Sequence, residues 1–310
     1  MEDGRIDITG ISGTSAGAIN AALIAEGATR DGADGAREAL ENFWMKMSRL
    51  GNFSIIQRTP FDRMMGNWTL DFSPGRMMYD AFIRTFSPYE FNPMGFNPLK
   101  ELIEETIDFD YVRRCSSFKL FMCATNVRTG KTKIFTGDEI TADAVMASAC
   151  LPEVYQAVEI DGEHYWDGGF MGNPPLYPLF YNTDCSDIVL VQINPIERQK
   201  VPGTAREIHN RVNEITFNST LLRELRMVEF VSRLIDDGKL SNDEYMRVNM
   251  HKIGAGPEMS KLSASSKLNL EQEFLIYLRD VGRHTADEWL EENFKQIGKK
   301  STLDLRNFFG

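Results

Sequence analysis

The sequence predicts an α/β protein with a central, mainly parallel sheet, helices on both faces of the sheet, and a helical C-terminal region. Three observations support this: a strand-like segment followed by a glycine turn and a helix near the start, several strand-like segments in the middle, and helical periodicity beyond Pro202. We place a soft boundary near Pro202, which gives a first domain over residues 1–202 and a helical region over residues 203–310.

The strand-like segments can be taken in chain order. Residues 6–11 alternate apolar with polar or small residues, and residues 16–26 indicate a helix that Gly27 ends. Strands are predicted at 118–124 and 131–136, on either side of the turn Arg128-Thr129-Gly130. Further strands are predicted at 154–160 and 187–193. Beyond Pro202, apolar residues at helical spacing indicate two amphipathic helices, one with Leu221, Leu225, Val228 and Ile235 and one with Phe274, Leu278, Val281 and Trp289.

Composition excludes several classes of function. The 310 residues are 42% hydrophobic and 25% charged, no apolar run is long enough for a transmembrane helix, and the first residues lack a signal pattern, so we expect a soluble, cytoplasmic protein. The net charge of −11 disfavours nucleic acid and anionic membranes, which leaves a neutral or zwitterionic substrate. Four widely spaced cysteines predict buried free thiols and no metal site.

Two stretches have irregular composition. Residues 41–100 hold twelve aromatics and seven methionines, interrupted by prolines and glycines. We expect most of these side chains to form buried core and irregular connections, although Met64-Met65 and Met77-Met78-Tyr79 could instead line a pliable acyl pocket or lid. The stretch from Gly254 to Ser266 is the candidate mobile loop of the second half.

Gly13-Thr14-Ser15-Ala16-Gly17 has the GxSxG spacing of a nucleophile elbow, in which small residues let a strained strand-to-helix turn push the serine hydroxyl outward. The N–H of Ala16 and the start of the following helix can then receive an oxyanion. The alternative is an ordinary small-residue turn between a strand and a helix. The strand predicted before Ser15 and the helix predicted after it favour the elbow.

Asp167-Gly168-Gly169 places a carboxylate beside two glycines that permit unusual backbone angles, although an isolated DGG is more often a surface turn. Asp167 is the candidate base for Ser15, because Trp166 and the glycines could tune its pKa. Histidine is the commoner base for serine. His164, His209, His251 and His284 all lie in polar hairpin, helical or loop stretches, so we expect each to be solvated or structural.

These segments resemble the patatin-like phospholipase family, whose members pair a GxSxG serine with a DGG or DGA aspartate in a catalytic dyad. The resemblance covers residues 5–195 and rests on segments in the family's order: residues 10–18, 124–126, 147–152, 167–169 and Asn173-Pro174. It implies a carboxylic ester hydrolase acting on lipids, with Ser15 as nucleophile, Asp167 as base and no cofactor. The region beyond Pro202 resembles helical extensions of some bacterial members.

One departure from the family concerns the oxyanion hole. Family members place a strand and a Gly-rich loop ahead of the serine strand, whereas fourteen residues precede Ser15 here and none forms such a loop. We therefore expect a hole with few donors beyond Ala16, unless Met1 is an internal start. The same short N-terminus excludes an ordinary α/β-hydrolase, which needs several strands ahead of its nucleophile.

The function predicted from the sequence is lipid acyl or carboxylic ester hydrolysis through an acyl-enzyme on Ser15. The alternative is an acyl- or lipid-binding protein weakened in catalysis by the incomplete hole. We expect a lipid or small ester as the substrate, no nucleic acid partner and at most peripheral contact with membranes. A strand edge left open in the sheet makes a homodimer plausible.

Overall fold

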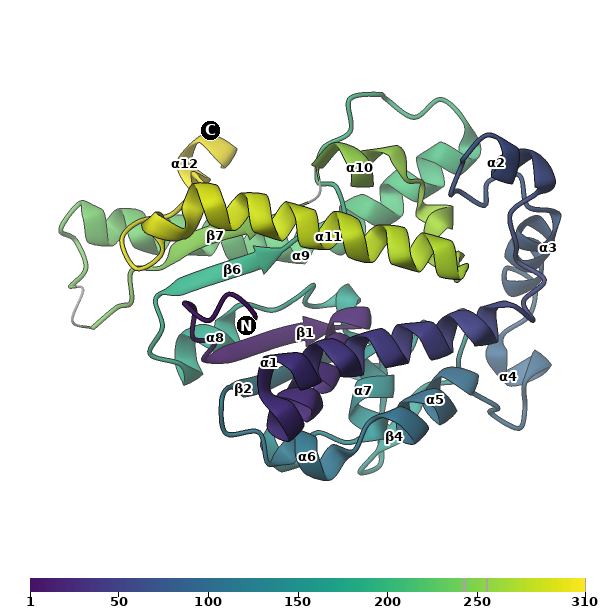
Figure 1. Ribbon diagram of the computed structural model, residues 1–310, viewed down its shortest axis with the longest axis horizontal. Helices are drawn as coiled ribbons and strands as arrows, with labels where there is room; N and C mark the ends of the chain where they lie inside the picture. The colour runs from purple at the N-terminus through teal and green to yellow at the C-terminus, as the bar shows by residue number, and fades with distance from the viewer. Residues whose placement is uncertain (242–243, 255, 310) are drawn as a thin grey trace. The chain divides into compact units, whose positions relative to one another are not determined.

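A computed structural model describes residues 1–241, 244–254 and 256–309 (Figure 1). The chain forms two compact units: residues 1–179 with 265–275, and residues 180–264 with 276–310. The domain boundary near Pro202 stays a prediction. No helix among the described residues is both long and apolar enough to cross a membrane.

The first unit is built on a five-stranded mixed sheet. Its strands run in the order β1-β2-β5-β4, and β3 also pairs with β2; their bounds are Gly10–Thr14 (β1), Lys119–Asn126 (β2), Thr132–Phe135 (β3), Val158–Ile160 (β4) and Glu163–Asp167 (β5). Only β1 and β2 pair in parallel, with Gly10 opposite Lys119 and Thr14 opposite Cys123.

The expectation of a mainly parallel sheet is therefore wrong for the described strands of this unit. The turn at residues 127–130 returns β2 onto β3, and the two-residue turn Asp161-Gly162 returns β4 onto β5. Connections this short join antiparallel neighbours, whereas a parallel pair needs a long crossover. Asp161 and Gly162 both have positive φ, 53° and 76°, as a tight hairpin turn requires.

Helix α1 (Ala16–Gly51) is a helical hairpin, broken at Asp31 and Gly32, where the backbone angles leave the helical region (Figure 1). The two arms touch at Gly27 and Gly35: a Cβ on Gly27 would lie 2.2 Å from the Gly35 carbonyl oxygen. Further along, Trp44 Nε1 donates to Asn20 Oδ1 at 3.0 Å. Gly27 therefore does not end the helix as predicted. Its missing side chain lets the two arms pack closely.

Four of the five prolines in residues 60–98 begin short helices, each with proline in its first turn: α2 (Pro60–Met64), α3 (Pro74–Ile83), α4 (Pro88–Phe91) and α5 (Pro98–Thr106). Polar residues precede them as N-caps, namely Thr59, Ser73, Ser87 and Asn97. The remaining helices of this unit are α6 (Phe109–Arg113), η1 (Gly137–Glu139), α7 (Ala142–Ser148) and η2 (Gly168–Phe170).

The core of the first unit lies between β2 and helices α1, α5 and α7. It buries large side chains such as Phe43, Ile103, Met122, Phe135 and Met146. All four cysteines are free thiols. Cys123 and Cys150 are buried as predicted, whereas Cys115 and Cys185 are only half-buried.

Most of the large apolar side chains in residues 53–96 are exposed, so the expectation of a buried core here is wrong. Fourteen of them are exposed: Phe53, Ile55, Phe61, Met64, Met65, Phe72, Met77, Met78, Phe82, Phe86, Tyr89, Phe91, Met94 and Phe96. The repeated prolines divide this stretch into short helices. A short helix can bury only part of its surface, which leaves the rest in solvent.

The second unit contains a parallel pair of strands, β6 (Asp187–Val191) and β7 (Asn249–Ile253). The predicted amphipathic helices are confirmed as α9 (Ala205–Asp236) and α11 (Gln272–Asn293), the latter starting in the first unit. The other helices are α8 (Tyr177–Asn182), α10 (Gly256–Lys261), η3 (Ala264–Leu268), η4 (Phe294–Gln296) and α12 (Leu305–Phe309). Within the candidate mobile loop, α10 and η3 are formed, and Ala255 lies outside the described residues.

Candidate active site

Ser15 is the single residue between the end of β1 and the start of α1. Its backbone angles, φ 56° and ψ −123°, are strained for a residue with a side chain. The buried Ser148 at the end of α7 holds this turn, because its Oγ accepts a hydrogen bond from the Ser15 N–H at 3.0 Å. The strand, strained turn and helix therefore form as the GxSxG spacing predicts.

Close packing requires a glycine at only one of the two glycine positions of the motif. A Cβ on Gly13 would lie 2.4 Å from the Gly17 carbonyl oxygen and 2.9 Å from the Ala18 nitrogen, so only glycine lets β1 pass this close to the first turn of α1. A Cβ on Gly17 would meet no atom within 4 Å. The close packing expected on both sides of Ser15 is thus found on the Gly13 side alone.

Donors for a developing negative charge are present at the start of α1. The Ser15 carbonyl accepts hydrogen bonds from the N–H groups of Ala18 and Ile19, at 2.9 and 3.2 Å, so the helix begins its own hydrogen bonding at Ala18. The N–H groups of Ala16 and Gly17 precede that point, and both residues are exposed. This helix end, with its positive dipole, can receive an anion beside Ser15.

Asp167 ends β5 and is 2% exposed. Its carboxyl lies near enough to the Ser15 side chain for the serine to lower its pKa, and its Oδ1 accepts a hydrogen bond from the Gly169 N–H at 2.7 Å. Its backbone is held on both sides: the N–H donates to the Cys150 carbonyl at 2.8 Å, and the carbonyl accepts from Thr125 Oγ1 at 2.9 Å. The structure therefore brings Ser15 and Asp167 together from elements more than 150 residues apart.

The glycines after Asp167 also have separate roles. A Cβ on Gly168 would lie 2.1 Å from the Cys123 carbonyl oxygen, so its missing side chain allows close contact with β2. Its φ lies outside the left-handed region, so the unusual backbone expected there is not found at Gly168. Gly169 contributes its N–H to the Asp167 carboxylate.

The electrostatic setting of Asp167 suits a base. Burial raises the pKa of this carboxyl above its usual value, and the Ser15 side chain and the hydrogen bond from the Gly169 N–H partly offset that rise. A higher pKa makes the carboxylate a better proton acceptor at neutral pH. The thiol of the nearby Cys150 stays protonated, since burial raises its pKa to about 12.

Two hydrogen bonds join the segment after Asp167 to strand β1, which precedes Ser15. Thr14 Oγ1 donates to the Gly172 carbonyl at 2.8 Å, and Ser12 Oγ donates to the Pro175 carbonyl at 2.6 Å. These two bonds join the strand that carries the nucleophile to the segment that carries the acid. They therefore help to fix the distance between Ser15 and Asp167.

Two positioning residues were missed by sequence reasoning, Ser148 and Thr125. Both lie in segments that carry the family resemblance, 147–152 and 124–126. Their presence in these motifs could have indicated that they support the site. Their hydroxyls bond backbone groups of Ser15 and Asp167. The local sequence pattern does not distinguish a serine whose hydroxyl bonds a backbone group far away in the sequence from a serine on the surface.

The four histidines bond to other partners. His164 and His284 are exposed beside Glu159 and Glu288, and His209 lies near Asn213 on α9. His251 was expected in a polar helical or loop stretch, and this is wrong. It lies in β7 with no exposed surface, where Nε2 is 2.9 Å from Asp187 Oδ1 and Nδ1 is 3.1 Å from Thr302 Oγ1.

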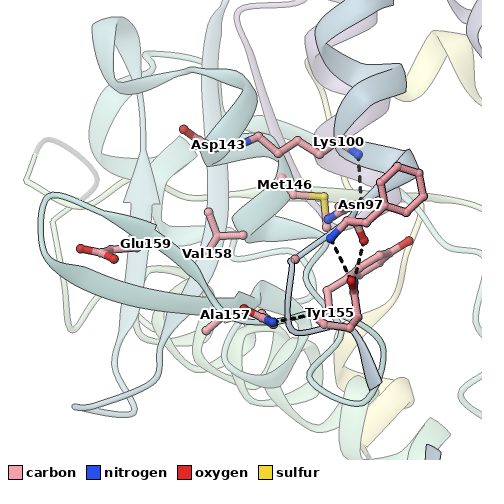
Figure 2. Close-up of a pocket in the computed structure, with 12 residues that line it drawn as sticks. Asn97, Lys100, Asp143, Met146, Tyr155, Ala157, Val158 and Glu159 are labelled. Atoms are coloured by element: carbon pink, nitrogen blue, oxygen red, sulfur yellow. Dashed lines mark hydrogen bonds and ion pairs between the residues drawn. The ribbon is translucent and has the colours of Figure 1, made fainter. Parts of the chain in front are cut away.

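A hollow of about 260 Å³ lies elsewhere in the first unit. Figure 2 shows Lys100, Asp143, Tyr155 and Val158 around it, and Lys100 Nζ is 2.7 Å from Asp143 Oδ1. Neither Ser15 nor Asp167 lines it, and Lys100 and Asp143 in its lining are paired with each other. Within the described part of the chain, no group of three or more His, Cys, Asp or Glu side chains could hold a metal ion.

Comparison with known protein families identifies a match over more than half of the chain. The sequence profile described as "Patatin-like phospholipase" matches residues 1–180, which include both Ser15 and Asp167. No curated protein matches the chain.

Proposed function

Because this chain belongs to the patatin-like phospholipase family, we propose that it hydrolyses carboxylic esters of lipids through a dyad of Ser15 and Asp167. The observation that carries the proposal is the strained Ser15 turn beside the buried Asp167 carboxylate, whose pKa burial raises and Ser15 lowers. A serine hydroxyl is a weak nucleophile, and a neighbouring base of suitable pKa activates it.

The proposed reaction has two steps. Ser15 Oγ attacks the ester carbonyl carbon while its proton passes to Asp167, and the negative charge on the carbonyl oxygen is stabilised by the N–H of Ala16 and the helix start. The tetrahedral intermediate collapses, the C–O bond to the alcohol breaks, and Asp167 returns the proton to the leaving oxygen. The acyl group then stays on Ser15.

Deacylation repeats these roles with water as the nucleophile. Asp167 accepts a proton from the water as its oxygen attacks the acyl carbon, and the bond to Ser15 Oγ breaks as that oxygen regains the proton. The products are a carboxylic acid and free Ser15. The bonds from Ser148 and Thr125 hold the two groups in place through both steps, and such positioning is a large part of catalysis.

The test is the turnover of p-nitrophenyl butyrate by Ser15→Ala and Asp167→Asn. We expect each to lower kcat/KM by at least about 10³-fold, because the two groups act as one unit. The control is His164→Ala, an exposed histidine close to Asp167 in sequence, which should stay near wild type. Activity of Ser15→Ala above a few per cent of wild type would refute the nucleophile. Covalent labelling of Ser15 by a fluorophosphonate without any ester turnover would support the acyl-binding alternative.

A further inference from the structure

The fourteen exposed apolar side chains of residues 53–96 named above are what we call the apolar surface; they lie on α2, α3 and α4, which Figure 1 labels, and on the loops before, between and after these helices. At roughly 150–250 Å² for a fully exposed aromatic side chain, they present on the order of 1,500 Å² in total. Large exposed apolar areas on proteins mark sites of interaction with proteins, membranes or ligands. Water contact on this scale is unfavourable, which indicates a surface that is covered during function.

Helix α3 has no fully buried residue, and its apolar side chains lie on both of its sides, with Tyr79 and Ile83 half-buried. Met77, Met78 and Phe82 are exposed, while Arg76 is largely covered and paired with Asp80, the Arg76 Nε lying 3.3 Å from Asp80 Oδ2. A helix that serves only the core directs its apolar side inward and its charges outward. The exposed apolar side of α3 is therefore available for contact with a partner outside this chain.

The segment that carries the apolar surface is anchored from its other side by polar and buried groups. The buried Arg58 donates from Nε to Glu271 Oε2 at 2.9 Å and lies over the ring of Trp68 at 4.1 Å. The Leu70 N–H donates to Ser265 Oγ at 2.8 Å, and Leu70 has no exposed surface. The segment is thus fixed with its apolar side chains outward rather than left unfolded.

Charge indicates the kind of partner. Residues 53–96 contain four arginines and four carboxylates, no lysine and no histidine, so the segment is neutral in a chain of net charge −11. Glu271 further neutralises Arg58 and Arg63. Anionic membranes attract clusters of Lys and Arg, and this surface has no such excess. A neutral apolar surface on an acidic chain fits a zwitterionic lipid layer.

The shape of the surface favours lipid over a folded protein partner. Phe53 is 91% exposed and Met94 is 94% exposed, so these side chains protrude from the loops that carry them. Insertion of protruding aromatic and methionine side chains into acyl chains needs no complementary pocket, whereas a protein interface packs its anchors into matched pockets.

The covered side of α3 lies near the segment that follows Cys150. Tyr79, half-buried on α3, is near enough to Glu153 for that carboxylate to help raise the pKa of Tyr79, and Tyr79 helps to raise the pKa of Tyr155. The Cys150 carbonyl, at the start of that segment, accepts a hydrogen bond from the Asp167 N–H. The segment that supports the acid is therefore a neighbour of α3.

We propose that the apolar surface docks this protein onto zwitterionic lipid layers, with the outward side of α3 entering the acyl region. This deepens the proposed function, on which it rests, by naming aggregated zwitterionic lipid as the form of substrate that the chain meets. Docking itself needs neither Ser15 nor Asp167, so the two proposals can be tested separately.

The experiment is co-sedimentation of the full chain carrying Ser15→Ala with phosphatidylcholine vesicles, so that no lipid is hydrolysed. The test variant adds Met78→Glu and Phe82→Glu on α3. The matched control adds Met227→Glu and Phe230→Glu on α9, which replaces the same residue types at similar exposure and adds the same charge. Circular dichroism checks that both variants stay folded.

We expect the parent chain to bind the vesicles, the α3 variant to bind at least about 10-fold more weakly, and the α9 variant to stay within about 2-fold of the parent. Addition of phosphatidylserine should not strengthen binding. Absence of binding by the parent, an equal loss in both variants, or binding only to anionic vesicles would overturn the proposal. So would self-association that the α3 substitutions abolish in the absence of vesicle binding.

A failure of the proposed function would give a different result from a failure of the docking proposal. With Ser15 restored, the α3 variant should hydrolyse soluble p-nitrophenyl acetate like wild type, because its substitutions lie outside the dyad. If vesicle binding behaves as expected while the Ser15→Ala chain keeps its esterase activity, docking stands and the dyad fails. If the dyad is supported and vesicle binding is absent, the docking proposal alone is wrong.

Discussion

Replacing Gly13 by alanine tests whether the close approach of β1 to α1 sets the geometry of Ser15. The added Cβ would lie 2.4 Å from the Gly17 carbonyl oxygen, 2.7 Å from the Gly17 carbonyl carbon and 2.9 Å from the Ala18 nitrogen. All three are backbone atoms of the first turn of α1, so no side-chain rotation can relieve the overlap. Overpacking typically costs about 1–3 kcal/mol, and we expect a loss near 3 kcal/mol in the free energy of unfolding.

Activity should fall as well, because relief of this overlap must move the turn that carries Ser15. A misplacement of about 1 Å can lower the rate by about 10²-fold. The assay combines urea unfolding followed by circular dichroism with kcat/KM for p-nitrophenyl butyrate. A loss of 3 kcal/mol corresponds to a fall of about 1 M or more in the urea midpoint.

The matched control is Gly17→Ala, the same substitution four residues along the same motif. Its Cβ would have no atom within 4 Å, so we expect a change in unfolding free energy within about 1 kcal/mol. If Gly13→Ala unfolds at the wild-type midpoint, or if both variants lose the same stability, the packing explanation for the motif is wrong.

Four further predictions concern the acid, the pH dependence of activity, the residue that supports the Ser15 turn, and a buried histidine. Asp167→Asn should stabilise folding at neutral pH while removing activity, because burial raises the pKa of Asp167 and so disfavours its charged form; thermal unfolding of the variant checks this. In the wild type, kcat/KM should fall as the pH drops through that raised pKa, since the base must be ionised, and a pH profile that stays flat down to the usual pKa of an aspartate would contradict it. Ser148→Ala, which leaves the Ser15 N–H without its acceptor, should cost about 1–3 kcal/mol of stability and lower kcat more than it raises KM in steady-state kinetics. His251→Ala should destabilise the chain by about 2–4 kcal/mol in urea unfolding while kcat/KM stays near wild type, because the imidazole is buried against Asp187 and Thr302 in the second unit.

Short-range patterns predicted the local elements of the candidate site. The GxSxG spacing predicted a strand, a turn and a helix around Ser15. Helices α9 and α11 followed from their apolar periodicity. In each case the backbone conformation depends on residues only a few positions apart.

Features that depend on distant contacts were missed. Gly27 looked like a helix end, because sequence does not distinguish a capping glycine from one that lets two helical arms touch. His251 was expected in a polar helical or loop stretch, as a solvated or structural residue, and its buried place in β7 was missed because its partners Asp187 and Thr302 lie more than 50 residues away in either direction.

The sequence also did not predict that most aromatic and methionine side chains of residues 53–96 point into solvent. Composition shows that these side chains are apolar, and core burial is the usual fate of such residues. Their exposure follows from the division of the stretch into short, proline-started helices and from the polar anchors at Arg58 and Asp62, which take the inward positions.

The central claim, that Ser15 is a nucleophile activated by Asp167, is tested most directly by fluorophosphonate labelling followed by mass spectrometry of the modified peptide. The reagent forms a covalent bond with an activated serine whether or not a particular ester is a substrate, so the result does not depend on knowing the natural lipid. We predict a single adduct, on Ser15, that is absent in Ser15→Ala and forms far more slowly in Asp167→Asn. An adduct on another serine, or labelling of Ser15 at the same rate in Asp167→Asn as in wild type, would contradict the dyad.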